Sequence, residues 1–283
     1  MLSRILPAFL AATFLAIPST LTAQSDDGPL GLKRNLRPLE HPFLEASYGI
    51  ALPSQKLFTG SFAPVGMLEA KLGYTDIRKW KGVLDLDEKF IYGGYMKSEY
   101  SLLRPDPGEV EAEMVRFGTG ARGGFGFPVW FLDIVPYSLY SFDLTKTTLS
   151  PTTSLASADS SILNRVEGAY RFGHSFEAGI QFRIFKSISA LASFQGSVIF
   201  PRFVFPKWFG SYMLMAGSMI LISNFAEDIV RSSPILGPVI YFVLRNGVAF
   251  AFYYALREQM NWPFPSETPL AMEAIRIGGS ISF

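Results

Sequence analysis

The segment EAIRIGGSISF, residues 273 to 283, is the stretch on which the fold prediction depends. Its apolar and polar side chains fall on opposite parities: Ile275, Ile277, Ile281 and Phe283 alternate with Arg276, Ser280 and Ser282. Successive side chains of a β-strand point to opposite faces, so this pattern predicts a strand with one apolar and one polar face. The rest of the chain has to supply the other strands of such a sheet.

The same two-residue alternation recurs upstream. It predicts strands within residues 43–52, 67–75, 90–100, 115–127, 132–142, 176–184 and 188–198. In the third of these, we expect Phe90, Tyr92 and Met96 to share the outer face, opposite Lys97 and Glu99. With the last strand this makes about eight, the smallest number that closes a membrane barrel. A soluble β-sandwich alternates in the same way, so the pattern alone does not separate the two architectures.

The composition excludes several classes of function. The chain has 25 Lys and Arg against 24 Asp and Glu, and a net charge of +1 provides no basic surface for nucleic acid. It has no Cys and two His, which excludes a disulfide framework and leaves little for a metal site. The glycines of residues 118–126 lie inside a predicted strand rather than in a phosphate-binding loop. We therefore expect neither a cofactor nor a metal.

The N-terminus has the layout of a secretory signal peptide. Arg4 precedes an apolar stretch over residues 5–17, and small residues follow up to Ala23. An N-terminal membrane anchor is the alternative, but the apolar run is shorter than the roughly 20 residues that span a bilayer. We expect residues 1–23 to be removed on export, residues 24–37 to form a flexible lead-in, and residues 38–283 to form the barrel domain.

An exported chain whose last strand alternates and closes on an aromatic residue resembles the outer-membrane β-barrel proteins of Gram-negative bacteria. The resemblance implies an all-β transmembrane antiparallel barrel of about eight strands in the bacterial outer membrane. It also implies two partners, outer-membrane lipid and the barrel assembly machinery, which recognises the C-terminal strand. The residues that would carry this assembly signal are Ile275, Ile277, Ile281 and Phe283.

The connections between the predicted strands alternate in length. Residues 128–130 and 185–187 form short connections after the fourth and sixth strands, whereas those after the first, third and fifth strands are longer. Short periplasmic turns and longer outer loops are typical of outer-membrane barrels, with both termini in the periplasm. Residues 145–161 are polar and rich in chain breakers, and we expect them to form an exposed loop.

An apolar insert between the last two strands does not fit a strand pattern. No charged residue lies within 208–226, a break follows near residues 231–234, and a second apolar run continues to Leu256. We expect a two-helix hairpin over about 206–260. The favoured interpretation is a packed hairpin that plugs or caps the barrel. A pair of transmembrane helices and an arm that docks on lipid or a partner are the alternatives.

Charged residues gather on the parity expected to face the lumen. A closed small barrel has to pair such charges, because an unpaired buried charge costs several kcal/mol. The favoured interpretation is a structural ion-pair lattice that makes the lumen solid, and the alternative is a polar conduit or binding cavity. Besides Lys97 and Glu99, the expected members are Glu45, Glu69, Lys71, Arg116, Arg122, Glu177, Arg183 and Arg276.

The sequence HSFE at residues 174–177 brings an imidazole, a hydroxyl and a carboxylate together. Lipid-modifying barrel enzymes use these residue types, so His174, Ser175 and Glu177 are weak catalytic candidates. Alternate residues of a strand face opposite sides, however, so His174 should diverge from Ser175 and Glu177. The sequence therefore favours a non-enzymatic barrel that binds a lipid, a small apolar solute or a protein. A narrow or gated channel and a lipid-modifying enzyme remain the alternatives.

Overall fold

The computed structural model describes residues 41–151, 156–185 and 187–283. The predicted signal peptide, residues 1–23, and the predicted lead-in, residues 24–37, lie outside the described residues. Both stay predictions.

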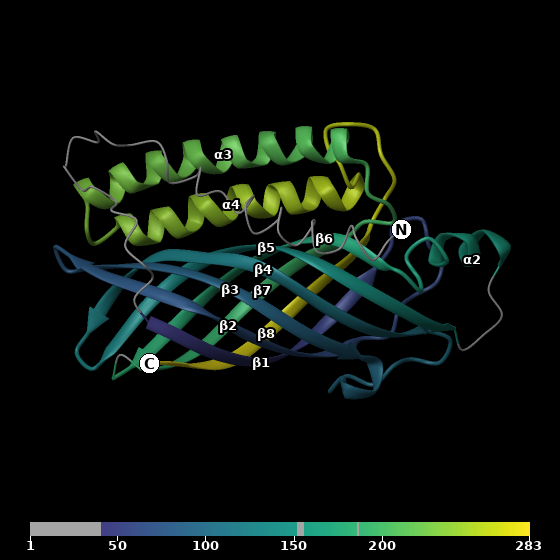
Figure 1. The fold of residues 1–283 in the computed structure, drawn as a ribbon, viewed down its shortest axis with the longest axis horizontal. Helices are drawn as coiled ribbons and strands as arrows, with labels where there is room; N and C mark the ends of the chain where they lie inside the picture. Colours follow the sequence, from purple (N-terminus) through teal and green to yellow (C-terminus); the bar gives the residue numbers. More distant parts are fainter. Residues whose placement is uncertain (1–40, 152–155, 186) are drawn as a thin grey trace. The chain divides into compact units, whose positions relative to one another are not determined.

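Eight antiparallel strands close into a barrel in which each strand pairs with its neighbours in the sequence (Figure 1). The eight-strand prediction is therefore confirmed, and β8 closes the ring by pairing with both β7 and β1. The strands are β1 (His41–Ser54), β2 (Val65–Trp80), β3 (Val83–Lys97), β4 (Val110–Val129), β5 (Leu132–Pro151), β6 (Tyr170–Ile184), β7 (Ile188–Ile199) and β8 (Leu270–Ser282).

The strand register is staggered around the barrel. A path through cross-strand partners from Leu44 passes once around the ring and returns to β1 at Ser54, ten residues further along. A stagger of this kind tilts the strands against the barrel axis. Eight tilted strands leave an interior only wide enough for side chains, so the inward-facing residues determine whether the barrel is open.

The two ends of the barrel differ. At the turn end, tight turns join β2 to β3, β4 to β5 and β6 to β7, as the sequence predicted for the latter two. Lys81 and Gly82 form the first turn with φ of 46° and 84°, the positive values that a two-residue turn between antiparallel strands requires. At the loop end the connections are longer and include the short helices η3 (Ser98–Tyr100) and α2 (Ser157–Leu163).

The loop predicted over residues 145–161 is wrong in its first part. β5 continues to Pro151, and Thr145 and Thr147 are fully buried in the lumen. This end of β5 lacks an apolar face, because its outward side chains include the exposed Lys146 and Thr148. The hydropathy pattern of a strand is therefore missing although the strand is present.

The face assignment of β3 is also wrong. Met96 pairs with the inward Met67, so Phe90, Tyr92 and Met96 point into the lumen and are buried. Lys97 has the opposite parity and forms an exposed ion pair with Glu99 of η3, outside the lumen. The interior accepts the aromatic rings of β3 because buried cations lie over them, as described below.

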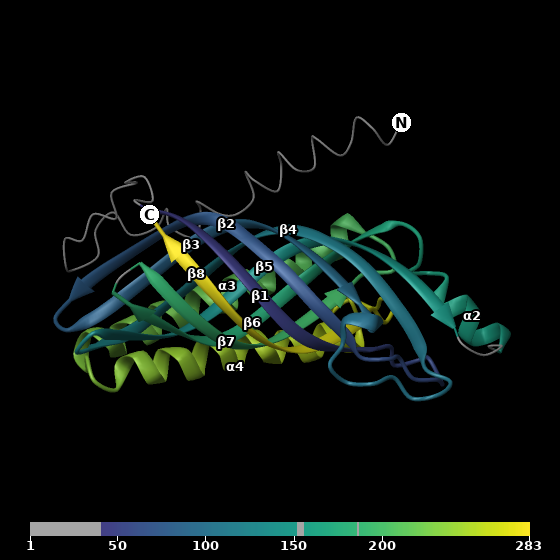
Figure 2. The same ribbon diagram turned by 90° about the horizontal axis from the view of Figure 1, so that it is seen from below.

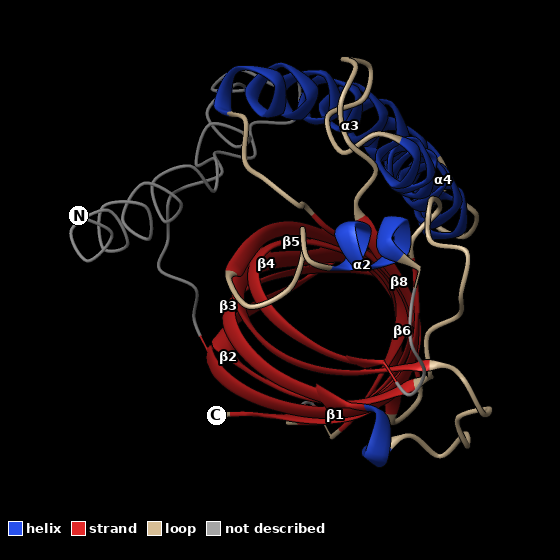
Figure 3. Cartoon of the chain, turned by 90° about the vertical axis from the view of Figure 1, so that its right-hand side faces the viewer, coloured by secondary structure: helices blue, strands red, loops and turns tan. Residues whose placement is uncertain are grey.

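Two long helices separate β7 from β8: α3 (Phe205–Ser232) and α4 (Gly237–Glu258). They form an antiparallel hairpin that lies lengthwise along the outside of the barrel (Figures 1 and 3), with α4 in contact with β4, β5, β6 and β7. The expectation that the hairpin plugs or caps the barrel is therefore wrong. Figure 2 shows the barrel from the other side, with β1, β2 and β8 toward the viewer and α3 and α4 behind the strands.

Candidate functional site

The lumen holds a cluster of ionised side chains contributed by six strands. Seven of the ten charges predicted for the lumen lie in it, and Glu88 of β3 is an eighth member that sequence reasoning missed. All eight are buried: Glu45 from β1, Glu69 and Lys71 from β2, Glu88 from β3, Arg116 and Arg122 from β4, Glu177 from β6 and Arg276 from β8. This set is called the lumen network below, and it contains four carboxylates and four cations.

Each cation of the lumen network bridges strands. Arg276 donates to Glu177 at 2.8 Å and to Glu69 at 2.6 Å. Lys71 lies 2.8 Å from Glu45, 3.5 Å from Glu69 and 3.8 Å from Glu177. The remaining contacts join Arg116 to Glu69 at 3.1 Å, and Arg122 to both Glu45 and Glu88 at 2.8 Å.

Aromatic rings complete the coordination of these cations. The Arg122 guanidinium lies 4.6 Å from the centroid of the Tyr137 ring, and Lys71 lies 5.3 Å from that of Phe90. The Tyr137 hydroxyl donates to Glu177 at 2.6 Å. A desolvated cation over an aromatic face is stabilised by the quadrupole of the ring. The inverted face of β3 is thus explained, because its rings pack under the cations of β2 and β4.

A second carboxylate centre lies beside the lumen network. Asp143 of β5 accepts hydrogen bonds from the hydroxyls of Ser175 at 2.8 Å, Thr145 at 3.1 Å and Tyr92 at 3.2 Å. Arg116 reaches Ser175 at 3.4 Å and so joins this centre to the lumen network. The predicted strand ended at residue 142, one residue before Asp143. The sequence therefore did not indicate that Asp143 belongs to the strand and faces the lumen.

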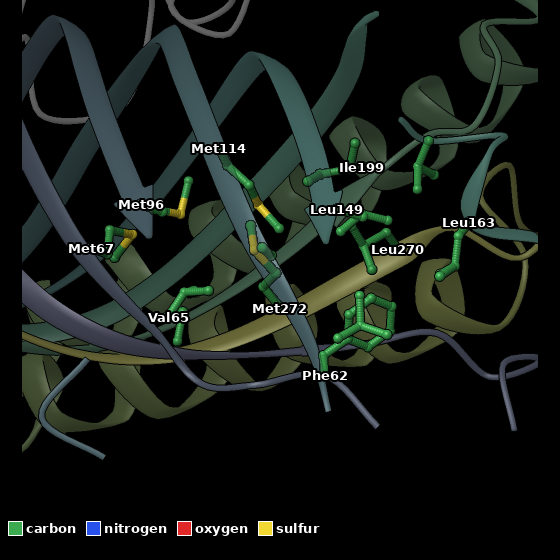
Figure 4. Close-up of a cluster of buried hydrophobic side chains, with 14 of the residues drawn as sticks. Phe62, Val65, Met67, Met96, Met114, Leu149, Leu163, Ile199, Leu270 and Met272 are labelled. Carbon is green, nitrogen blue, oxygen red and sulfur yellow. The ribbon is translucent and has the colours of Figure 1, made fainter. Parts of the chain in front are cut away.

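A buried apolar cluster fills the lumen at the loop end (Figure 4). It contains four methionines, Met67, Met96, Met114 and Met272, from four different strands. Phe58 and Phe62 of the β1–β2 connection and Leu163 of α2 pack against it from outside the sheet. Methionine fills irregular gaps well because it is unbranched and flexible. This methionine cluster fills the interior between the lumen network and the loop end of the barrel.

Besides Lys97 and Glu99, one further predicted lumen charge lies outside the network, namely Arg183. It lies near the turn end of β6 and pairs with Asp133 of β5 at 3.3 Å.

The three catalytic candidates do not converge. Ser175 and Glu177 face the lumen and take part in the contacts described above, whereas His174 points outward beneath the hairpin. The Trp208 indole N–H of α3 donates to His174 Nε2 at 3.0 Å, and the Tyr140 hydroxyl contacts Nδ1. Both ring nitrogens of His174 are thus engaged away from Ser175. An enzyme that uses these residues as a triad is not supported by this geometry.

His174 belongs to a seam of polar contacts that hold the hairpin to the wall. Asn246 of α4 donates to the Tyr137 carbonyl at 3.5 Å, and Glu273 of β8 accepts from Arg257 at 2.7 Å. The ring of Tyr253 lies against Gly196, where an added Cβ would meet it at 2.9 Å. Sequence reasoning missed this seam. The available signal was a histidine on the outward parity of an otherwise apolar strand, which implies a covering element.

The predicted assembly-signal residues lie on the outer face of β8. Ile275, Ile277 and Ile281 are largely exposed there, and the Phe283 N–H donates to the Pro42 carbonyl of β1. Their role in assembly stays a prediction.

No protein-family model matches this chain, and no curated protein matches it. Two proteins of solved structure show a weak overall likeness to this chain. Neisserial surface protein A is 9% identical with a TM-score of 0.39, covering 86% of this chain and 97% of that one. Ail, the attachment invasion locus protein of Yersinia pestis, is 6% identical with a TM-score of 0.30, covering 86% and 98%. At these TM-scores nothing further follows from the likeness, so the barrel is assigned from its own strand order and register.

Proposed function

We propose that the protein is an integral β-barrel of the bacterial outer membrane with a sealed interior, and that it acts as a non-enzymatic, non-conducting membrane component. The observation that carries this proposal is the opposite chemistry of the two faces of the wall. Ionised side chains point inward and are buried, whereas large aliphatic side chains point outward and are exposed. On the uncovered side the outward set includes Leu44, Leu68, Leu72, Ile91, Ile275, Ile277 and Ile281.

The height of this aliphatic belt supports immersion in lipid. On β2 the outward positions from Gly66 to Tyr74 carry no charged residue, and Asp76 ends this uncharged run toward the turn end. A tilted strand needs about 9 to 11 residues to cross the hydrocarbon core. On the neighbouring β3, Lys89 lies opposite Tyr74 and marks the same boundary. By the usual asymmetry of such barrels, the turn end would face the periplasm and the loop end the outside.

The filled lumen supports a barrel that does not conduct. The lumen network binds six strands together, and the methionine cluster lies between it and the loop end. An ion would have to separate buried charge pairs and then pass an apolar layer, and both steps are costly.

Three measurements test the proposal. In cells, the protein should fractionate with the outer membrane. After purification and refolding, unboiled protein should migrate differently from boiled protein in SDS gels. In planar bilayers it should give no single-channel steps. Reproducible steps would favour the alternative of a narrow or gated channel, and recovery in the soluble fraction would overturn the membrane assignment.

A further inference from the structure

The outer face of the hairpin is apolar over most of its length. Both helices are long and apolar enough to cross a membrane, and only 17% of the apolar window of α3 and 33% of that of α4 is buried. The exposed side chains include Phe209, Met213, Leu214, Leu221, Phe225, Val239 and Val243. A soluble surface rarely carries a contiguous apolar patch of this kind.

The charges of the hairpin are confined to its two ends, with one exception. Lys207, Arg257 and Glu258 lie at the loop end, and Glu227, Asp228 and Arg231 lie near the tip, where the two helices meet. The exception, Arg245, lies between the helices, where it donates to Ser223 at 3.3 Å and contacts the Tyr241 hydroxyl. The Arg245 guanidinium therefore has polar partners between the two helices rather than none on the outer face.

The tip of the hairpin reaches the turn end of the barrel. Val230 and Tyr241, on either side of the tip, pack against Val83, the first residue of β3 after its tight turn. The hairpin thus starts at the loop end and runs the height of the wall, as Figure 1 shows. At a rise of 1.5 Å per residue, α3 and α4 are about 42 Å and 33 Å long, which exceeds the roughly 30 Å of hydrocarbon.

We propose that α3 and α4 cross the outer membrane as a helical hairpin packed against the outside of the barrel, with lipid acyl chains as the occupant of their outer face. The inference rests on the proposed function, since the same membrane surrounds the aliphatic belt. Exposed apolar side chains thus lie both on the uncovered strands and on the outer face of the hairpin. The seam supports the arrangement, because lifting the hairpin would leave His174 Nε2 facing hydrocarbon without its Trp208 donor. Residues 233–236 then lie on the periplasmic side, although the hairpin enters from the outside.

Single cysteines test this topology cleanly because the chain contains none. The probe is a charged, membrane-impermeant maleimide, applied to intact cells, to osmotically opened cells and to SDS-denatured protein. Gln259→Cys should react in intact cells, Ile235→Cys only after opening, and Leu221→Cys only in SDS. Reaction of Ile235→Cys in intact cells, or of Leu221→Cys without SDS, would overturn the proposal.

A matched control separates this failure from failure of the proposed function. Trp130→Cys lies on a tight turn of the barrel itself, and it should react under the same conditions as Ile235→Cys. Reaction of Trp130→Cys in intact cells would refute the barrel orientation and not the hairpin alone. Each variant is first checked for the gel shift of the folded barrel.

A second readout identifies the occupant. A bimane label on Leu221→Cys, in purified protein reconstituted at low density, should lose most of its fluorescence in vesicles of brominated phosphatidylcholine. An unquenched label would show that a second copy, rather than lipid, covers α3, and would overturn the proposal.

Discussion

Replacing Arg276 with methionine should strongly destabilise the barrel. Methionine retains much of the side-chain volume but removes the two charged contacts, to Glu177 at 2.8 Å and to Glu69 at 2.6 Å. Glu69 keeps Arg116 at 3.1 Å, whereas the nearest cation left to Glu177 is Lys71 at 3.8 Å. The lumen network then has four carboxylates and three cations, and Glu177 is the under-compensated charge.

The expected loss in the free energy of unfolding is about 3–5 kcal/mol, the range for breaking one side of a buried ion pair. Urea unfolding of the barrel in lipid vesicles, followed by fluorescence of its four tryptophans, measures this loss as a lower midpoint at unchanged slope. The double variant Arg276→Met/Glu177→Gln should recover part of it, because the orphaned charge is gone. The coupling between the two sites should be about 0.5–3 kcal/mol.

The matched control is Arg257→Met, which breaks a 2.7 Å pair with Glu273 whose side chains are about one-third exposed. That pair should contribute about 1 kcal/mol or less. If Arg276→Met costs no more than Arg257→Met, the lumen network is not a buried lattice and the reasoning fails.

Three further substitutions have controls within the same chain. Trp208→Phe removes the N–H donated to His174 and leaves a buried acceptor unsatisfied, so the free energy of unfolding in urea should fall by about 1–3 kcal/mol. Its control, Trp130→Phe at a 95% exposed site, should leave that free energy unchanged, and equal losses in the two variants would contradict the seam. Met114→Ala in the methionine cluster opens a cavity and should lower the free energy of unfolding by about 2–5 kcal/mol. Met213→Ala on the exposed face of α3 should lower it far less, and an equally small loss for Met114→Ala would argue against a filled lumen. Gly196→Ala should push the Tyr253 ring off the wall and increase cleavage of the 259–269 connection by added protease. Its control, Gly247→Ala, has open space around the added Cβ and should leave cleavage unchanged. Unchanged cleavage in Gly196→Ala would show that the contact of Gly196 with Tyr253 does not hold α4 to the barrel.

The alternation in the sequence was sufficient to predict the number of strands because most outward positions are aliphatic. It failed where the barrel departs from that rule. β5 beyond Phe142 has threonines inward and polar residues outward, so neither face is apolar and the strand was assigned to a loop. On β3 the inward face carries Phe90 and Tyr92 under cations, so hydrophobicity assigned the wrong side.

The lumen network was predictable where a charged residue occupies an inward-facing position of a predicted strand. Seven network charges follow from parity alone, but Glu88 and Asp143 lie just beyond the predicted strands and were missed. The place of the hairpin depended on contacts between distant segments, such as His174 with Trp208, which no local pattern reports. The helices themselves were predictable because the uncharged run over residues 208–226 is longer than the uncharged stretch of any strand and lacks the two-residue alternation.

The central claim is that lipid surrounds the outward parity of the strands while the inward parity is sealed from lipid and water. Spin labels placed singly at each position from Leu68 to Tyr74 of β2, in barrels reconstituted into vesicles, measure it most directly through accessibility to molecular oxygen. Leu68, Ala70, Leu72 and Tyr74 should show high oxygen accessibility, and Glu69, Lys71 and Gly73 low accessibility in folded protein. Loss of the two-residue period, or high accessibility of Leu68 and Leu72 to a water-soluble nickel chelate instead, would contradict the account.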